Sequence, residues 1–242
     1  MIIEDFGTLS NGKECKLYTL QTPALDLSVT DYGTTLVNLI VKDGDKKTDI
    51  VLGFSNAKDY ETKNDPCFGC NVGRNANRIK NGKFTLNNVA YSLDQNDGKN
   101  NLHSGNNPYF KRIWNVETYD ANHITFSLNS PNMDQGFPGE IKVFVTYKII
   151  NNNSFEIIFE GIPKEDTIIN ITNHSYFNLN GEGSGSVLDH SVQIFADYYT
   201  PANRESIPLG TVESVKNTPM DFTSPKKIGL EIENDFQQLI YG

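Results

Sequence analysis

Short apolar runs, with Gly, Asn and Asp frequent between them, recur from one end of this chain to the other. Dense short strands punctuated in this way are typical of a β-sandwich or barrel, and no long amphipathic helical pattern interrupts them. The expected strands span residues 15–21, 25–31, 36–42, 49–52, 84–86, 90–93, 113–118, 123–128, 141–150, 154–161, 167–172 and 191–196. The sequence therefore predicts an all-β protein.

The sequence predicts one hairpin and contains no linker-like segment that would divide it into domains. Residues 141–150 and 154–161 are joined by Asn151, Asn152 and Asn153, and Asn tolerates the positive φ angles of tight turns. No internal repeat is visible, and 242 residues are enough to bury a substantial core. We expect one continuous domain over residues 1–242.

Charge and hydropathy disfavour several partners. The formal charge is −9, and Lys and Arg are scattered rather than gathered into a stripe, which disfavours binding to nucleic acid. The first residues lack a positive region followed by an apolar core, and no later run is long enough to cross a bilayer. We expect a soluble, cytoplasmic protein without nucleic-acid or membrane partners, and the sequence does not indicate its oligomeric state.

The three cysteines give no sign of a disulfide framework. Their number is odd, and Cys67 and Cys70 have CxxC spacing without a second CxxC or a neighbouring helical pattern. We therefore interpret this pair as structural.

The segment 168–181 presents a single histidine among small polar side chains. With a period of two, one strand face carries Ile169 and Ile171. The other carries Asn170, Thr172, His174 and Tyr176. Such a strand either exposes its polar face to solvent or lines a polar cleft with it. In a cleft, His174 would be the proton-transfer group, because the ordinary pKa of imidazole lies near neutral pH.

Two further segments, 71–80 and 94–107, are rich in Asn, Gly and charge, and predict ordered loops where binding residues collect. Asn77 and Arg78 place an amide beside a guanidinium, a pair that suits a polyhydroxylated ligand and equally a solvated turn. His103 lies between a leucine and a small-residue turn, where it could donate to a ligand, act as acid or base, or cap the loop.

Signatures of other enzyme classes are missing from the sequence. It has no Gly-rich phosphate cradle, no His-x-x-x-His metal pair and no Gly-x-Ser-x-Gly elbow, and spacing alone selects no carboxylate pair. We interpret His123 and His190 as structural or solvent-facing. From the residues alone, we predict a β-rich protein with a polar cleft built from Asn77, Arg78, His103, His174 and Tyr176.

An ordered set of motifs carries a family resemblance that runs from Phe6-Gly7 almost to the last residue. The motifs are Asp31-Tyr32-Gly33, residues 49–54, Gly73-Arg74, Asn77-Arg78-Ile79, Asn101-Leu102-His103, and residues 136–140, 172–179, 196–201, 207–210 and 218–222. By these motifs the chain resembles aldose 1-epimerases, also called galactose mutarotases.

The resemblance implies an enzyme that interconverts the α and β anomers of free aldoses such as galactose and glucose. It implies a large antiparallel β-sandwich without metal or organic cofactor. An acid protonates the ring oxygen while a base removes the proton of the C1 hydroxyl; the ring opens, rotates and closes on the other face. By motif, His174 matches the general acid and His103 a histidine near the ring oxygen. Asn77 and Arg78 match groups that hold sugar hydroxyls, and Tyr176 is expected in the same pocket.

Two departures from the family pattern matter. Ser104 stands where relatives have the first Gly of His-Gly-Gly, which is tolerable unless that position needs a positive φ.

In the family, an aromatic-Asp-His-Asn motif follows the segment that corresponds to residues 236–242, and the catalytic glutamate comes later. We therefore expect that these 242 residues lack the general base and the C-terminal strands, and that this polypeptide alone has little activity. No carboxylate stands in the family's glutamate context among Glu205, Glu213, Asp221, Glu231 and Glu233.

Two other functions stay open at this point. A noncatalytic carbohydrate-binding protein of the same fold would keep Asn77, Arg78 and His103 without needing a base. A relative that acts on a phosphorylated hexose would want extra positive charge, and the acidic balance of the chain weighs against it.

Overall fold

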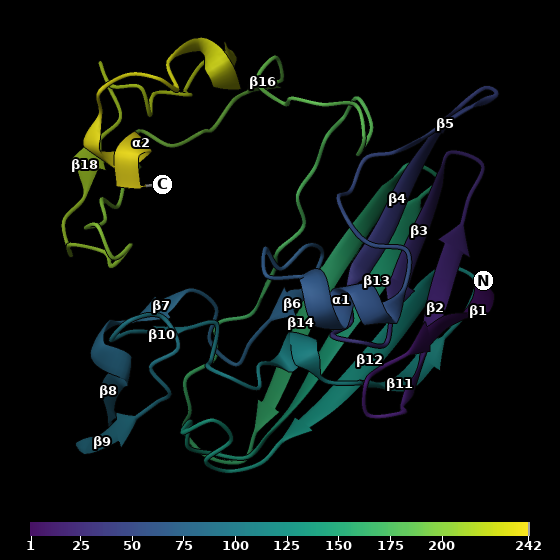
Figure 1. The fold of residues 1–242 in the computed structure, drawn as a ribbon, viewed down its shortest axis with the longest axis horizontal. Helices are drawn as coiled ribbons and strands as arrows, with labels where there is room; N and C mark the ends of the chain where they lie inside the picture. The colour runs from purple at the N-terminus through teal and green to yellow at the C-terminus, as the bar shows by residue number, and fades with distance from the viewer. Residues whose placement is uncertain (242) are drawn as a thin grey trace. The chain divides into compact units, whose positions relative to one another are not determined.

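The computed structural model describes residues 1–241, which form two compact units, Met1–Glu182 and a second one that begins at Gly183. The first unit is built around two antiparallel sheets (Figure 1). One sheet contains, in order, β1 (Ile2–Thr8), β2 (Glu14–Gln21), β3 (Leu25–Thr30), β4 (Leu36–Asp43) and β5 (Lys46–Asp49). The other contains β11 (Asn115–Tyr119), β12 (His123–Ser130), β13 (Ile141–Asn151) and β14 (Ser154–Pro163).

Apolar side chains that alternate along the strands form one core between these two sheets. In β13, every second residue from Ile141 to Ile149 is buried, which is the pattern of a strand with one face in a core. Leu20 and Leu27 of the first sheet belong to the same buried cluster. The ring of Tyr18 meets that of Phe126 edge to face, with centroids 5.6 Å apart. The predicted all-β sandwich is confirmed.

A short helix covers part of the other face of the first sheet. Helix α1 (Ala57–Lys63) begins at Asn56, whose side chain accepts the N–H of Asp59 at 2.9 Å. Ala57 and Tyr60 of this helix pack with Phe6 in a second buried cluster. This helix was not predicted from the sequence, although Asn followed three residues later by Asp is a recognisable N-terminal capping pattern.

Smaller elements of the first unit carry the loops beside the sandwich. They are β6 (Asn71–Val72), β7 (Arg78–Ile79), β8 (Lys83–Leu86), β9 (Val89–Ser92), β10 (Asn101–Leu102), β15 (Thr172–Asn173), and the 3-10 turns η1 (Lys80–Gly82) and η2 (Tyr109–Lys111). β8 pairs with β9, β7 with β10, and β6 with β15.

The predicted hairpin is confirmed as β13 and β14, although none of its three turn asparagines has a positive φ. The strand predicted at 167–172 is wrong. Ile169 is 44% exposed, and Asn170 forms only an isolated bridge with Asn75. The Asn170 N–H donates to the carbonyl of Arg74. The backbone of this stretch therefore bonds to a loop rather than to a neighbouring β-strand.

The second unit contains short elements only. They are β16 (Ser191–Val192), β17 (Tyr198–Tyr199), β18 (Glu213–Ser214), β19 (Lys226–Lys227), the 3-10 turn η3 (Ile228–Leu230) and α2 (Gln237–Tyr241). β16 pairs with β19 and β17 with β18, so the strand predicted at 191–196 is only two residues long. One continuous domain over 1–242 stays a prediction. Within residues 1–241, no helix has both the length and the apolar character that a membrane crossing needs.

Candidate functional site

Three segments that are far apart in the sequence meet at one pocket of the first unit. Pairing of β7 with β10 joins the loop at 71–80 to the loop at 94–107, and pairing of β6 with β15 brings the segment around His174 beside them. The pocket has a volume of about 360 Å³ and is lined by Ala76, Asn77, His103, Thr172, Asn173, His174, Ser175 and Tyr176. Four of the five predicted site residues are therefore brought together.

The two loops fix His103 through a pair of hydrogen bonds. The backbone N–H of Asn77 donates to His103 Nδ1 at 3.0 Å, and the backbone N–H of His103 donates to the carbonyl of Asn77 at 3.1 Å. Because Nδ1 accepts, the neutral ring carries its proton on Nε2, which is then available as a donor. Both residues have a positive φ, 62° for Asn77 and 53° for His103.

The surroundings of His103 favour its neutral form. Its pKa is lowered from 6.5 to about 4, mainly by burial and also by the charges of His174 and Arg78, against an opposing effect of Asp97. His103 is therefore suited to donate a hydrogen bond from a neutral ring rather than to deliver a proton.

His174 lies between His103 and Tyr176. Its ring is perpendicular to that of His103, with centroids 5.5 Å apart, and 5.3 Å from the ring of Tyr176. Its backbone N–H donates to the carbonyl of Cys70 at 2.8 Å. The predicted alternation of faces fails here, because consecutive residues from Thr172 to Tyr176 all line the pocket. The strand ends at Asn173, after which the period of two no longer applies.

A buried polar network from the sandwich core holds the strand before His174. Tyr147 of β13 is fully buried, and its hydroxyl accepts from the amide of Asn71 at 2.8 Å and donates to the carbonyl of Thr34 at 2.7 Å. The Asn173 amide donates to Asn71 Oδ1 at 3.0 Å and to the Gly69 carbonyl at 2.9 Å. Burial raises the pKa of the Tyr147 phenol, so the hydroxyl keeps its proton.

Tyr147 and Asn71 were not predicted as support for the site. The signal for Tyr147 is a polar side chain at an inward strand position, since it alternates with buried Val145 and Ile149.

Arg78 lies beside the pocket rather than among the residues that line it. Its Nε donates to Asp97 at 2.7 Å, and the side chain is 24% exposed. Its role toward a sugar stays a prediction. The charge of Arg78 nevertheless acts on the pocket, because it is one of the causes that lower the pKa of His103.

Ser104 occupies a position that does require positive φ. Its φ is 73°, in the region that favours glycine, and the residue is fully buried. The hydroxyl accepts the backbone N–H of Asn75 at 2.7 Å and donates to the Asn75 carbonyl at 3.1 Å. Serine is therefore accommodated here, because its hydroxyl ties the His103 loop to the neighbouring loop.

Arg74, of the Gly73-Arg74 motif, is structural. The side chain is 1% exposed, and its guanidinium donates to the carbonyls of Pro138 and Gly139, both at 2.8 Å. Its Nε donates to the Tyr109 hydroxyl at 3.2 Å. Arg74 therefore joins the start of the Asn77 loop to the 136–140 motif through buried hydrogen bonds.

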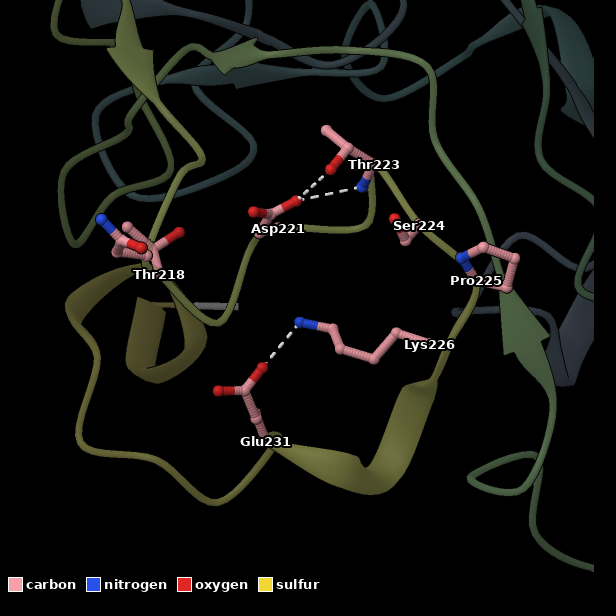
Figure 2. A pocket seen from close by; sticks show the side chains of 8 residues that line it. Thr218, Asp221, Thr223, Ser224, Pro225, Lys226 and Glu231 are labelled. Carbon is pink, nitrogen blue, oxygen red and sulfur yellow. Dashed lines mark hydrogen bonds and ion pairs between the residues drawn. The ribbon is translucent and has the colours of Figure 1, made fainter.

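A second hollow lies in the second unit (Figure 2). It has a volume of about 500 Å³ and is lined by Asn217, Thr218, Asp221, Thr223, Ser224, Pro225, Lys226 and Glu231. Thr223 donates to the Asp221 carboxylate from its N–H and its hydroxyl, at 3.1 and 2.7 Å. Lys226 Nζ donates to Glu231 at 2.7 Å. Its charged groups have partners within the hollow and no histidine lines it, so the first pocket is the better candidate.

The remaining predicted groups lie outside the first pocket. His123 Nδ1 lies 3.0 Å from the Asp120 carboxylate, and His190 Nδ1 lies 3.0 Å from the carbonyl of Val187. Cys15, Cys67 and Cys70 are free and buried. Among residues 1–241, no group of three or more His, Cys, Asp or Glu side chains is arranged to hold a metal ion.

Comparison of the sequence with known proteins gives consistent matches. The family model described as Aldose 1-epimerase matches residues 16–239. The chain is 38% identical over 230 residues to a galactose mutarotase of Sus scrofa, covering 94% of this chain and 66% of that protein. It is also 38% identical to an aldose 1-epimerase of Haemophilus influenzae, with the same two coverages. The chain spans about two thirds of the length of these curated relatives.

Solved structures give the same result for the fold. A galactose 1-epimerase from Lactobacillus acidophilus matches with a TM-score of 0.87 and 27% identity, over 99% of this chain and 70% of that one. An aldose epimerase homologue from C. elegans matches with a TM-score of 0.83 and 29% identity, over 91% and 69%.

Proposed function

This chain belongs to the aldose 1-epimerase family, and we propose that its pocket at His174 binds a free aldohexose and takes part in interconverting the α and β anomers. The observation that carries the proposal is the meeting of His103 and His174 at one pocket, with perpendicular rings 5.5 Å apart. The names of the relatives point to galactose as a substrate, and we use it as the first probe.

We assign different roles to the two histidines. His103 donates from Nε2 to a sugar oxygen, because its Nδ1 is occupied by Asn77 and its neutral form is favoured. His174 delivers the proton to the ring oxygen as the C1–O bond of the ring breaks. When the ring closes, the same nitrogen takes the proton back, so the acid of one direction is the base of the other.

The composition of the pocket supports a free aldose rather than a phosphorylated hexose. Its eight lining residues include neither Lys nor Arg, and Arg78, which follows Asn77 in the sequence, is paired with Asp97. A phosphate group would bring close to two negative charges to this surface without a cationic partner. Asn77, Thr172 and Asn173 instead offer neutral donors and acceptors, which suit hydroxyl groups.

The pocket also bears on how active these 242 residues are by themselves. None of the eight lining residues is a carboxylate, Nδ1 of His103 already accepts the N–H of Asn77, and we assign His174 to the ring oxygen. These roles leave no lining group to remove the proton of the C1 hydroxyl. We therefore propose that this polypeptide binds the sugar but catalyses slowly. The same observation favours a second candidate function, a noncatalytic carbohydrate-binding protein.

Two measurements on the 242-residue polypeptide test these proposals. D-galactose titrated into the chain should bind saturably, and His103→Gln should weaken that binding. Polarimetry of freshly dissolved α-D-glucose should give a rate close to the spontaneous one. Any excess rate should fall roughly a hundredfold in His174→Gln, the scale of acid–base catalysis.

Each outcome has a separate meaning. Absence of galactose binding would contradict the proposal that this pocket is a sugar site. A rate like that of the relatives would contradict the proposed lack of a base. Binding without any excess rate would favour the carbohydrate-binding alternative for this polypeptide.

A further inference from the structure

The loop at 67–70, which contains the CxxC pair, has a tightly defined backbone. The side chain of Asn64, at the end of α1, accepts the N–H of Phe68 at 2.7 Å and donates to its carbonyl at 3.2 Å. Gly69 has a φ of 68°, and a Cβ built there would lie 2.0 Å from the carbonyl oxygen of Leu36. Only glycine fits that position, and the two hydrogen bonds of Asn64 hold the backbone of Phe68 beside it.

The same loop supports the His174 segment through its backbone. The carbonyl of Cys70 accepts the N–H of His174 at 2.8 Å. The carbonyl of Gly69 accepts the side-chain amide of Asn173 at 2.9 Å. The 67–70 loop therefore lies directly behind the residues that line the sugar pocket.

Aromatic rings extend this support into the pocket. Phe68 meets Tyr176 edge to face, with centroids 5.4 Å apart and planes at 74°. The ring of Tyr176 is 5.3 Å from that of His174, which in turn meets His103. On its other side Phe68 packs against Phe54 at 5.9 Å. The four rings from Phe68 to His103 thus form an unbroken series of contacts.

We propose that Phe68 is a positioning residue of the sugar pocket, which acts by holding the ring of Tyr176 and through it the plane of the His174 imidazole. Tyr176 is 43% exposed, so much of its surface has no protein packed against it. Edge-to-face contact with a half-buried Phe68 supplies the missing restraint. This inference rests on the proposed function, and it gives the CxxC segment a role that depends on the phenylalanine and the backbone rather than on the thiols.

The test compares ring positions and sugar binding in variants of the 242-residue chain. The ¹H–¹³C signals of the His174 ring are recorded without sugar, and D-galactose is then titrated. In Phe68→Leu, we expect the His174 signals to move and galactose affinity to fall roughly three- to tenfold, the worth of one aromatic pair. Phe68→Trp retains an aromatic ring and should restore affinity to within about twofold.

Two comparisons separate positioning from general loosening of the core. Phe54→Leu removes the ring behind Phe68, and should change affinity by less than about twofold. Phe68→Leu combined with Tyr176→Leu should be no weaker than Tyr176→Leu alone, because Phe68 acts through Tyr176. Urea unfolding of every variant checks that it is folded under the conditions of the titration.

Unmoved His174 signals in Phe68→Leu, or additive losses in the double variant, would overturn the inference. If the leucine variant does not fold, Phe68→Met, with a flexible side chain that fills the same space, replaces it. If the unaltered chain binds no galactose, the proposed function fails, but the His174 signals still decide whether Phe68 positions the ring.

Discussion

The Nδ1 atom of His103 accepts the backbone N–H of Asn77 at 3.0 Å, so one loop selects the tautomer of a histidine on another. From the sequence, this imidazole could have been an acid, a base or a loop cap. The contact with Asn77 favours the neutral ring with its proton on Nε2, where it can donate.

The stability of the chain should depend on pH through His103. Its pKa is lowered from 6.5 to about 4 in the folded state, so between these values the unfolded chain binds a proton that the folded chain does not. The contribution of His103 to the free energy of unfolding is therefore fully present above pH 6.5 and is lost as the pH falls toward 4. Urea unfolding of the unaltered chain and of His103→Gln, on both sides of this window, measures it.

The comparison with His103→Gln is needed because Asp31 has the opposite effect. Burial raises the pKa of Asp31 from 3.8 to about 6, so the folded chain holds the extra proton between these values and its stability rises as the pH falls. Asp31 is the same in both chains, so its contribution cancels in the difference. A difference that does not change with pH would contradict the lowered pKa of His103.

Replacing His174 should change the titration of its neighbour. Burial is the largest cause of the low pKa of His103, and the charge of His174 is the next. In His174→Gln the pKa of His103 should therefore rise above about 4 while staying below 6.5. An NMR titration of the His103 ring measures this, and an unchanged midpoint would mean that the two rings are not coupled.

Arg74→Met should destabilise the fold strongly. It leaves the buried carbonyls of Pro138 and Gly139 without their donor, and each such loss costs about 1–3 kcal/mol. We expect a loss of more than about 3 kcal/mol in the free energy of unfolding, measured in urea. Arg204→Met, at an exposed position, is the matched control and should stay within about 0.5 kcal/mol.

Ser104 offers a test with two substitutions of opposite character. Ser104→Ala keeps the unfavourable φ of 73° and loses both hydrogen bonds to Asn75, at a cost of about 1–3 kcal/mol. Ser104→Gly loses the same hydrogen bonds but relieves the backbone, so it should be more stable than the alanine variant by about 1 kcal/mol. Thermal or urea unfolding ranks the two, and the reverse order would show that strain at this position is unimportant.

Local sequence pattern was sufficient for the sandwich but not for the path of the chain beside it. The alternation from Ile141 to Ile149 predicts β13 because each inward residue meets the core. The same reasoning fails at Ile169, which is exposed because its neighbour Asn170 bonds to a loop rather than to a strand. An alternating run forms a β-strand only if another strand pairs with it, and that strand can be distant in the sequence.

The candidate site shows the same division. Asn77, His103, His174 and Tyr176 were predicted from residue type and family motif, and they line one pocket. The support behind them was not predictable, because Tyr147 reaches Asn71 across 76 positions of sequence. The pairing of Arg78 with Asp97 likewise depends on how two loops fold against each other.

The most direct test of the proposed sugar site is a titration of D-galactose into the 242-residue chain with its histidine rings labelled for NMR. We expect saturable shifts of the His103 and His174 signals at a common galactose concentration, while the His123 and His190 signals stay unchanged. Saturable binding that leaves His103 and His174 unmoved would contradict the assignment of this pocket as the sugar site.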